Sequence, residues 1–286
     1  MRLLNRLALH LATLVAVVLA GGFLAAALVR YSPGFDSIPE DLNTALSPET
    51  LQALHARYNR ENSLPRFYVR YLGGALRGDF GVSQSFGQPV ALLLRQRAPA
   101  TGRLVIWGTL GGWTLAALLA WTAVWLRRSV LTAAAASVSG LLLAIPPAVL
   151  ALAFFFYQAP LGLALSLGLL PRLFGTLRAI LEECHASPAL LAARARGIGP
   201  LRIGVCYVAG AAAPQLLALL GIAIVLAFGL AIPIETLCGV PGMGALTVQA
   251  ATARDMPLLC ALALMITFLV TFVHAAGDLA AGDERA

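Results

Sequence analysis

The sequence predicts an all-α, polytopic membrane protein with six transmembrane helices and a structured external segment after the first helix. Of its 286 residues, 59% are hydrophobic and 12% are charged, whereas a soluble domain carries about 25% charged residues. The mean hydropathy is +0.84. Six runs in the chain are apolar over the roughly 20 residues that a helix needs to cross a bilayer.

The first apolar run admits two interpretations. It could be a signal peptide, since three alanines at residues 25–27 resemble a cleavage site, but it exceeds the roughly 7–15 apolar residues of such a signal. A retained helix is therefore favoured. The six predicted spans cover residues 7–29, 104–126, 129–157, 161–181, 206–232 and 258–279.

Between the first two spans lies a long polar segment. The predicted division is an N-terminal helix at 1–30, an external segment at 31–99 and a five-helix core at 100–286. Within the external segment, Ser47, Pro48 and Glu49 are typical of a helix start, so a helix is expected over residues 47–59. The segment could be a cap packed on the outer ends of the spans, a binding surface for a partner, or both.

Charge and composition exclude several functions. All 20 basic residues are arginine, so neither a P-loop for ATP nor a lysine Schiff base can form. The net charge of +7 is scattered around apolar runs rather than gathered on one soluble face, which argues against a nucleic-acid partner. The four cysteines and four histidines lack metal-ligand spacing. The chain is therefore expected to hold no cofactor or metal.

The distribution of arginines predicts the orientation, because basic residues accumulate in short cytoplasmic loops. If the N-terminus is cytoplasmic, the outer loop over residues 233–257 contains only Arg254. The cytoplasmic positions are then Arg2, Arg6, Arg127, Arg128, Arg194, Arg196 and Arg202.

Three features inside the spans suggest contacts other than lipid. Arg172 falls near the middle of the fourth span, where a charged side chain normally faces a bundle interior or an aqueous cavity. Pro146 and Pro147 should bend or break the third span, either to line a pathway or as a packing kink. Gly108 and Gly112 permit close helix packing.

The segment SPALLAARARGIGPLRIG, residues 187–204, separates the fourth and fifth spans. Pro188 can begin a helix there, and Gly197 can end it in the left-handed conformation. Such a helix of about two turns is too short to be stable alone, so neighbouring spans or a partner must support it. An ordinary connecting loop is the alternative interpretation.

Several segments, in order, resemble the membrane permease subunits of ABC importers in the oligopeptide, dipeptide and nickel family. RGDFGVSQSFGQPVALLLRQRAPAT at residues 77–101 is similar to the family pattern R-G-D-x-G-x-S…P-V…R-x-P-x-T. ETLCGVPGMGALTVQAATARDMP at residues 235–257 is similar to the block E-T-x-F-x-x-P-G-x-G…A…R-D-x-P, and AARARG resembles the cytoplasmic A-R-A-K-G turn.

This resemblance implies a subunit of a bacterial inner-membrane importer for peptides or related solutes, including nickel chelates. Its partners would be a second homologous permease, two ABC ATPase subunits that bind the ATP, an extracytoplasmic solute-binding protein and membrane lipid. The segment around residues 187–200 would be the coupling helix that docks on an ATPase. The positions expected in that contact are Leu190, Ala193, Arg194, Arg196 and Gly197.

Two further groups of residues are expected to be functional, the first because of the span features described above and the second because of the resemblance. Pro146, Pro147 and Arg172 are expected along the translocation pathway. Positions expected to face external partners are Arg77, Asp79, Glu235, Pro241 and Gly242. Two other functions compete with the permease: a channel or scaffold working alone, and an intramembrane enzyme using Arg172, Glu182 and Glu183. The enzyme interpretation lacks a nucleophile–base pair.

Overall fold

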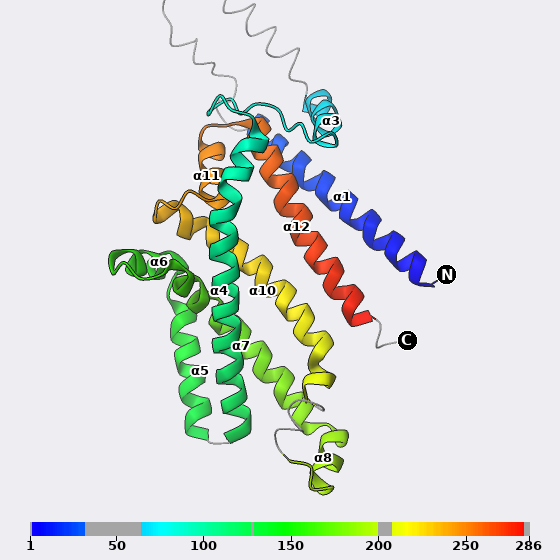
Figure 1. The fold of residues 1–286 in the computed structure, drawn as a ribbon, viewed down its shortest axis with the longest axis vertical. Helices are drawn as coiled ribbons and strands as arrows, with labels where there is room; N and C mark the ends of the chain where they lie inside the picture. Colours follow the sequence, from blue (N-terminus) through cyan, green and yellow to red (C-terminus); the bar gives the residue numbers. More distant parts are fainter. Residues whose placement is uncertain (1, 32–63, 127–128, 200–207, 283–286) are drawn as a thin grey trace, which may run out of the picture. The chain divides into compact units, whose positions relative to one another are not determined.

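A computed structural model describes residues 2–31, 64–126, 129–199 and 208–282 of the chain (Figure 1). The regular elements described are helices, apart from one isolated antiparallel bridge between Val82 and Pro89. The expected all-α fold is confirmed. The helices are α1 (Arg2–Arg30), α3 (Leu64–Ala75), α4 (Val90–Leu126), α5 (Ser129–Ala144), α6 (Pro147–Phe156), α7 (Leu161–Ala186), α8 (Pro188–Ala195), α10 (Ala209–Leu237), α11 (Met243–Thr252) and α12 (Met256–Gly282).

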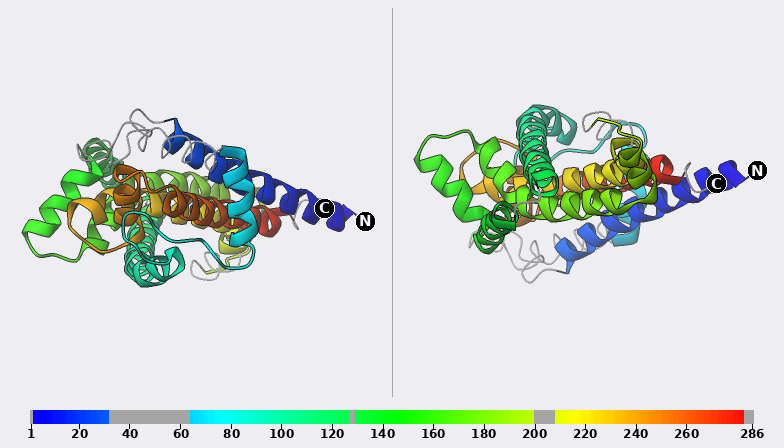
Figure 2. Two further views of the ribbon diagram at one scale, coloured as in Figure 1. Left: turned by 90° about the horizontal axis from the view of Figure 1, so that it is seen from above. Right: turned by 90° about the horizontal axis from the view of Figure 1, so that it is seen from below.

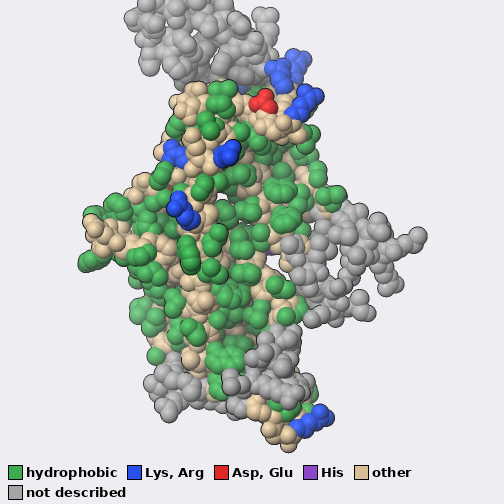
Figure 3. Space-filling model, in the orientation of Figure 1, with side chains coloured by type: hydrophobic (Ala, Val, Ile, Leu, Met, Phe, Trp, Pro, Cys, Tyr) green, Lys and Arg blue, Asp and Glu red, His purple; other side chains and the backbone are tan. Residues whose placement is uncertain are grey.

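Among the described residues, five helices are long and apolar enough to span a membrane, namely α1, α4, α7, α10 and α12. A sixth span results if α5 and α6, which meet at an angle of 90°, are counted together. The visible face of the described chain is accordingly covered mainly by hydrophobic side chains (Figure 3). The helix expected over residues 47–59, and the basic positions Arg127, Arg128 and Arg202, lie outside the described residues.

The proline pair breaks the third span as predicted. Pro146 has an extended backbone (φ −58°, ψ 134°) immediately before α6, and Pro147 is the first residue of that helix. The first N–H groups of a helix have no partner within it, so proline, which lacks an N–H, is tolerated at the start of α6. The same proline pair cannot continue α5. The bend therefore follows directly from the Pro146-Pro147 sequence.

The chain divides into two compact units, one formed by residues 1–98 with 246–271 and the other by residues 99–245 with 272–286. In the first unit, α1 and α3 are joined by Tyr68, whose hydroxyl donates to the Leu19 carbonyl at 2.6 Å. The Tyr68 ring also meets Phe23 edge-on, with centroids 5.6 Å apart. Gly22 permits this approach, because a Cβ there would clash with Tyr68 and Leu264.

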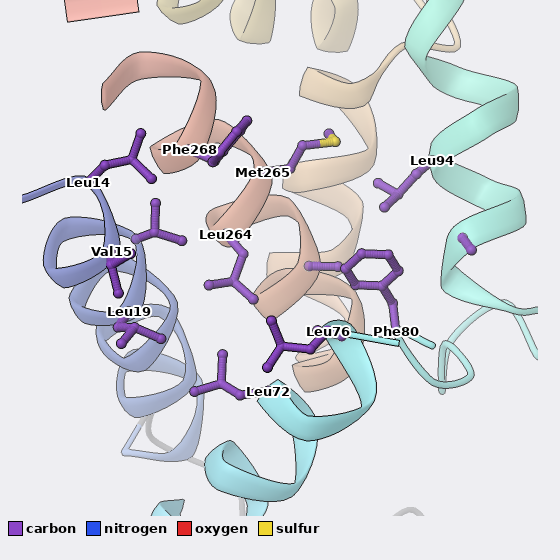
Figure 4. A pocket seen from close by; sticks show the side chains of 14 residues that line it. Leu14, Val15, Leu19, Leu72, Leu76, Phe80, Leu94, Leu264, Met265 and Phe268 are labelled. Atoms are coloured by element: carbon purple, nitrogen blue, oxygen red, sulfur yellow. The ribbon is translucent and has the colours of Figure 1, made fainter. Parts of the chain in front are cut away.

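The first unit also has an open apolar pocket with a volume of about 510 Å³ (Figure 4). Side chains from α1, α3, α4 and α12 point into it, together with Leu76 and Phe80 from the loop after α3. The side chains labelled there are Leu14, Val15, Leu19, Leu72, Leu76, Phe80, Leu94, Leu264, Met265 and Phe268.

The core of the second unit is built on α7 and α10, which lie side by side (Figure 2). Leu165, Leu169 and Leu173 repeat every four residues on α7 and are fully buried. On α10 a row of small residues with the same spacing is buried in the same core: Ala223, Ala227 and Ala231.

The glycine pair in α4 packs against α7 as predicted. A Cβ at Gly108 would clash with Leu165, and one at Gly112 would lie 3.2 Å from the Leu169 Cβ. Ser166 Oγ donates to the Gly108 carbonyl at 3.0 Å. The absence of side chains at both positions therefore lets α4 approach α7 closely.

Candidate functional site

The short helix α8 begins and ends where the sequence predicts. Ser187 precedes it with an extended backbone (φ −66°, ψ 140°), and its Oγ accepts the Leu190 N–H at 3.4 Å. At the other end Gly197 has φ +72°. The Ile198 N–H then donates to the Ala193 carbonyl at 3.2 Å, the bond that closes a Schellman motif.

One face of α8 is anchored to its own chain. Leu190 and Ala193 are each 2% exposed and belong to the hydrophobic core built around α7 and α10. Both side chains thus pack against their own chain, and their expected place in the ATPase contact stays a prediction. Arg196 and Gly197 are exposed. The side chain of Arg194 lies outside the described residues.

A second cluster surrounds Glu235, at the end of α10. Its Oε1 accepts the Thr101 hydroxyl at 2.6 Å, and its Oε2 accepts the Gly244 and Ala245 N–H groups at 2.7 and 3.2 Å. Those N–H groups belong to the first turn of α11, where an anion is favoured by the helix dipole. Glu235 therefore caps a helix that begins eight residues later in the sequence.

This arrangement corrects two predictions of the sequence. Glu235 is 0% exposed, so it cannot face an external partner in this conformation. Gly242 is buried as well, and a Cβ there would clash with the Glu235 carboxylate. Both residues serve the internal packing of the loop between α10 and α11.

A third cluster surrounds Asp255, between α11 and α12. Its Oδ2 accepts three hydrogen bonds, from Ser83 Oγ at 2.5 Å and from the N–H and Oγ of Ser85 at 3.0 and 2.7 Å. Its Oδ1 accepts the Leu258 N–H at 3.2 Å and so caps α12. Burial alone would raise the pKa of this carboxyl, but these bonds lower it below its ordinary value of 3.8.

The two long sequence blocks thus meet at both buried carboxylates. Ser83, Ser85 and Thr101 come from the block at residues 77–101, and Glu235 and Asp255 from the block at 235–257. Sequence reasoning assigned no role to these three hydroxyl residues. A buried serine or threonine normally requires a hydrogen-bond partner, but a single sequence does not show that these residues are buried.

Comparison with known proteins identifies the family to which this architecture belongs. Residues 104–282 match the family of binding-protein-dependent transport system inner membrane components. The chain belongs to that family. It is also 26% identical to a dipeptide transport system permease protein of Lactococcus lactis, over 94% of each chain. An oligopeptide transport system permease protein of Haemophilus influenzae is 26% identical over 88% of each chain.

Membership in this family makes the chain a multi-pass inner-membrane protein and the non-enzymatic part of a transport system. The family implies a complex that also contains an ATPase and a binding protein. This excludes the two competing functions, an enzyme and a channel working alone. Glu182 and Glu183, the acids of the enzyme hypothesis, are both exposed.

The remaining predicted positions of this inner-membrane component are mostly exposed. Arg77, Asp79 and Pro241 are exposed outside the spanning helices. Arg172 and Pro146 are exposed within the spanning part, and Pro147 is half-buried. The five exposed side chains, those other than Pro147, therefore remain accessible to a partner, a pathway or lipid, whereas Glu235 and Gly242 do not.

Proposed function

We propose that this chain is a peptide permease subunit of an ABC importer, and that α8 is the helix through which ATPase subunits drive it. The relatives named for dipeptide and oligopeptide transport support the substrate class, because they align with nearly the whole chain. The single observation that carries the coupling role is α8 itself. It is a capped two-turn helix, buried on one face and exposed at Arg196.

The geometry of α8 suits the transmission of force. A two-turn helix that is unstable in isolation is stabilised here by Leu190 and Ala193 in the core and by the Ser187 and Gly197 ends. Displacement of α8 by a partner would consequently move α7 with it. The exposed Arg196, with Arg194 and Gly197 beside it in the sequence, would supply the partner contact, through charge-assisted bonds to acids or carbonyl groups.

The complete importer would pair this chain with a second homologous permease, two ATPase subunits and an extracytoplasmic binding protein. The N-terminus would lie in the cytoplasm and α8 on the side of the ATPases, an orientation that the arginine distribution favours. Arg77, Asp79 and Pro241 would be available to the external partners. ATP binding and release would then bias two packings of the spans, one open to each side.

The experiment that tests the coupling role is charge reversal. The double variant Arg194→Glu, Arg196→Glu should lose copurification with the ATPase while inserting normally in the membrane. Arg66→Glu, on the exposed surface of α3, is the matched control and should retain the ATPase. An intact, ATP-hydrolysing complex in the double variant would overturn the assignment.

The substrate class is tested separately, with the assembled complex in proteoliposomes. ATP-dependent uptake of a labelled dipeptide, absent when the binding protein is omitted, is the expected result. If the complex assembles and hydrolyses ATP but takes up no peptide, the coupling role survives and the peptide assignment is wrong.

A further inference from the structure

A groove on the second unit is lined by both polar and small side chains. It lies between α5 and α7 and has a volume of about 410 Å³. Both helices belong to the candidate spans. Small and polar residues make up much of its lining, among them Ala136, Ser139, Gly140, Gly175, Arg178 and Glu182.

The glycines of this groove differ from those that pack helices together. A Cβ at Gly140 or Gly175 would meet no atom within 4 Å, whereas one at Gly108 would clash with α7. Among the described residues, none packs against Gly140 or Gly175 from outside its own helix. Helices of a membrane protein use small residues where something approaches closely, and within the described residues nothing does so here.

The wall of the groove carries an ion pair. Arg178 Nε donates to Glu182 Oε1 at 2.7 Å, and the two side chains are 33% and 51% exposed. Charged groups within spanning helices face a bundle interior or an aqueous cavity rather than lipid. A guanidinium has five N–H donors, and within the described ranges this bond uses one of them. The charged end of the groove is therefore suited to a polar occupant.

We propose that the groove between α5 and α7 is a binding site on the translocation pathway for the two charged ends of a short peptide. This inference rests on the proposed peptide-permease function. Arg178 would bind the terminal carboxylate, since the guanidinium fork matches a carboxylate with two parallel bonds. Glu182 would accept the terminal ammonium, and Ser139 Oγ, 3.5 Å from the Pro171 carbonyl, adds a polar group on the facing helix.

The spacing of the pair favours a short zwitterion. Residues at i and i+4 of a helix have Cβ atoms about 5–6 Å apart. Two extended residues span at most about 7 Å, so the ends of a dipeptide can reach both partners together. The exposed Arg178–Glu182 bond is of the kind that contributes little by itself, and so the peptide can replace it.

The first test asks whether the groove is wet and whether peptide enters it. In the full complex, Ser139→Cys should react with a charged thiol reagent, and excess dipeptide should slow the reaction. Leu118→Cys, on the exposed apolar surface of α4, is the control and should stay unlabelled. No reaction at position 139 would mean that lipid or a partner helix fills the groove. Reaction without protection would exclude the peptide. Either result overturns the proposal.

The second test measures transport by the full complex in proteoliposomes. Arg178→Gln and Glu182→Gln should each reduce dipeptide uptake at least about tenfold, as expected for loss of one charge-assisted contact. Arg103→Gln, on the exposed surface of α4 and outside the groove, should leave uptake unchanged. Arg178→Gln should also remove the preference for a free dipeptide over its C-terminal amide. If Arg178→Gln retains that preference, the proposal is wrong. It is also wrong if either variant loses the second permease from the complex.

These outcomes are distinguishable from failure of the proposed function. If the unmodified complex transports no peptide, the proposed function is wrong before any variant is compared. If it transports peptide and the variants match it, only the site between α5 and α7 is wrong.

Discussion

Thr101 and Glu235 are 134 positions apart in the sequence, and the Thr101 hydroxyl donates to the Glu235 carboxylate at 2.6 Å. The same hydroxyl accepts the Met243 N–H at 2.7 Å, so it connects the carboxylate to the start of α11. All these groups are buried. The loop after α10 is therefore held by a buried polar network. Each of these hydrogen bonds satisfies one buried donor and one buried acceptor.

Replacing Thr101 by valine should destabilise this loop. The substitution keeps the shape of the side chain but removes the hydroxyl that bonds the Met243 N–H and one Glu235 oxygen. An unsatisfied buried group costs about 1–3 kcal/mol. We expect a lower midpoint of thermal unfolding for the purified protein in detergent. Thr101→Ser, which keeps the hydroxyl, is the control and should unfold near the unmodified protein. Equal midpoints for the valine and serine variants would contradict the network.

Gly242 should tolerate no side chain. A Cβ there would clash with the Glu235 carboxylate, so Gly242→Ala must displace the carboxylate from the first turn of α11. Overpacking of this kind typically costs about 1–3 kcal/mol, and the unfolding midpoint should fall. Gly229→Ala is the matched control in α10, because a Cβ there meets nothing within 4 Å. If Gly242→Ala and Gly229→Ala lower the unfolding midpoint equally, the clash with Glu235 is not the cause of the lost stability.

The sequence predicted the features that depend on neighbouring residues. The break at Pro146 and Pro147 and the two ends of α8 follow from local backbone preferences. The all-α class followed from apolar runs of spanning length. Each of these predictions needs only residues within one or two helical turns.

The failures concern relationships across the chain. Glu235 follows an apolar run, which suggested an exposed loop, but its partner Thr101 lies 134 positions away. A single sequence does not reveal such a pairing, so the burial of Glu235 and Gly242 was missed. The second span was predicted from residue 104, whereas α4 begins at Val90 and continues through Pro99. Pro99 has no N–H to donate within α4. The helical turns on either side of it keep the helix continuous.

Asp255 should make the stability of the first unit depend on pH. Hydrogen bonds from Ser83, Ser85 and Leu258 lower its pKa in the folded state below the ordinary value of 3.8. Its contribution is therefore complete above about pH 4 and is lost as the pH falls through the folded pKa. The unfolding midpoint should stay level from pH 7 to about 5 and fall upon further acidification.

Asp255→Asn isolates this effect from that of other carboxyl groups. At pH 7 the variant should be about 1 kcal/mol less stable, because hydrogen bonds to a charged acceptor are stronger than those to a neutral one. The difference in stability between Asp255→Asn and the unmodified protein should narrow below about pH 4. A difference that stays constant down to pH 2 would show that the charge of Asp255 is not what stabilises the loop.

Gly197 should be required for coupling because of its backbone conformation. Its φ of +72° lies in the left-handed region, and a Cβ there would meet no atom within 4 Å, so an effect of alanine would arise from strain and not from a clash. Strain of about 1–2 kcal/mol is large for a two-turn helix, and Gly197→Ala should weaken copurification of the ATPase.

Two variants make this prediction specific. Asparagine adopts the left-handed conformation more readily than other residues with a side chain, so Gly197→Asn should retain more of the ATPase than Gly197→Ala. Gly199 also has open space around it but lacks a positive φ, so Gly199→Ala should behave as the unmodified protein. All three variants should insert in the membrane normally, because the described α8 residues that belong to the core, Leu190 and Ala193, are unchanged in them. If alanine at 197 and at 199 weakened the association equally, the left-handed end of α8 would not be what the ATPase requires.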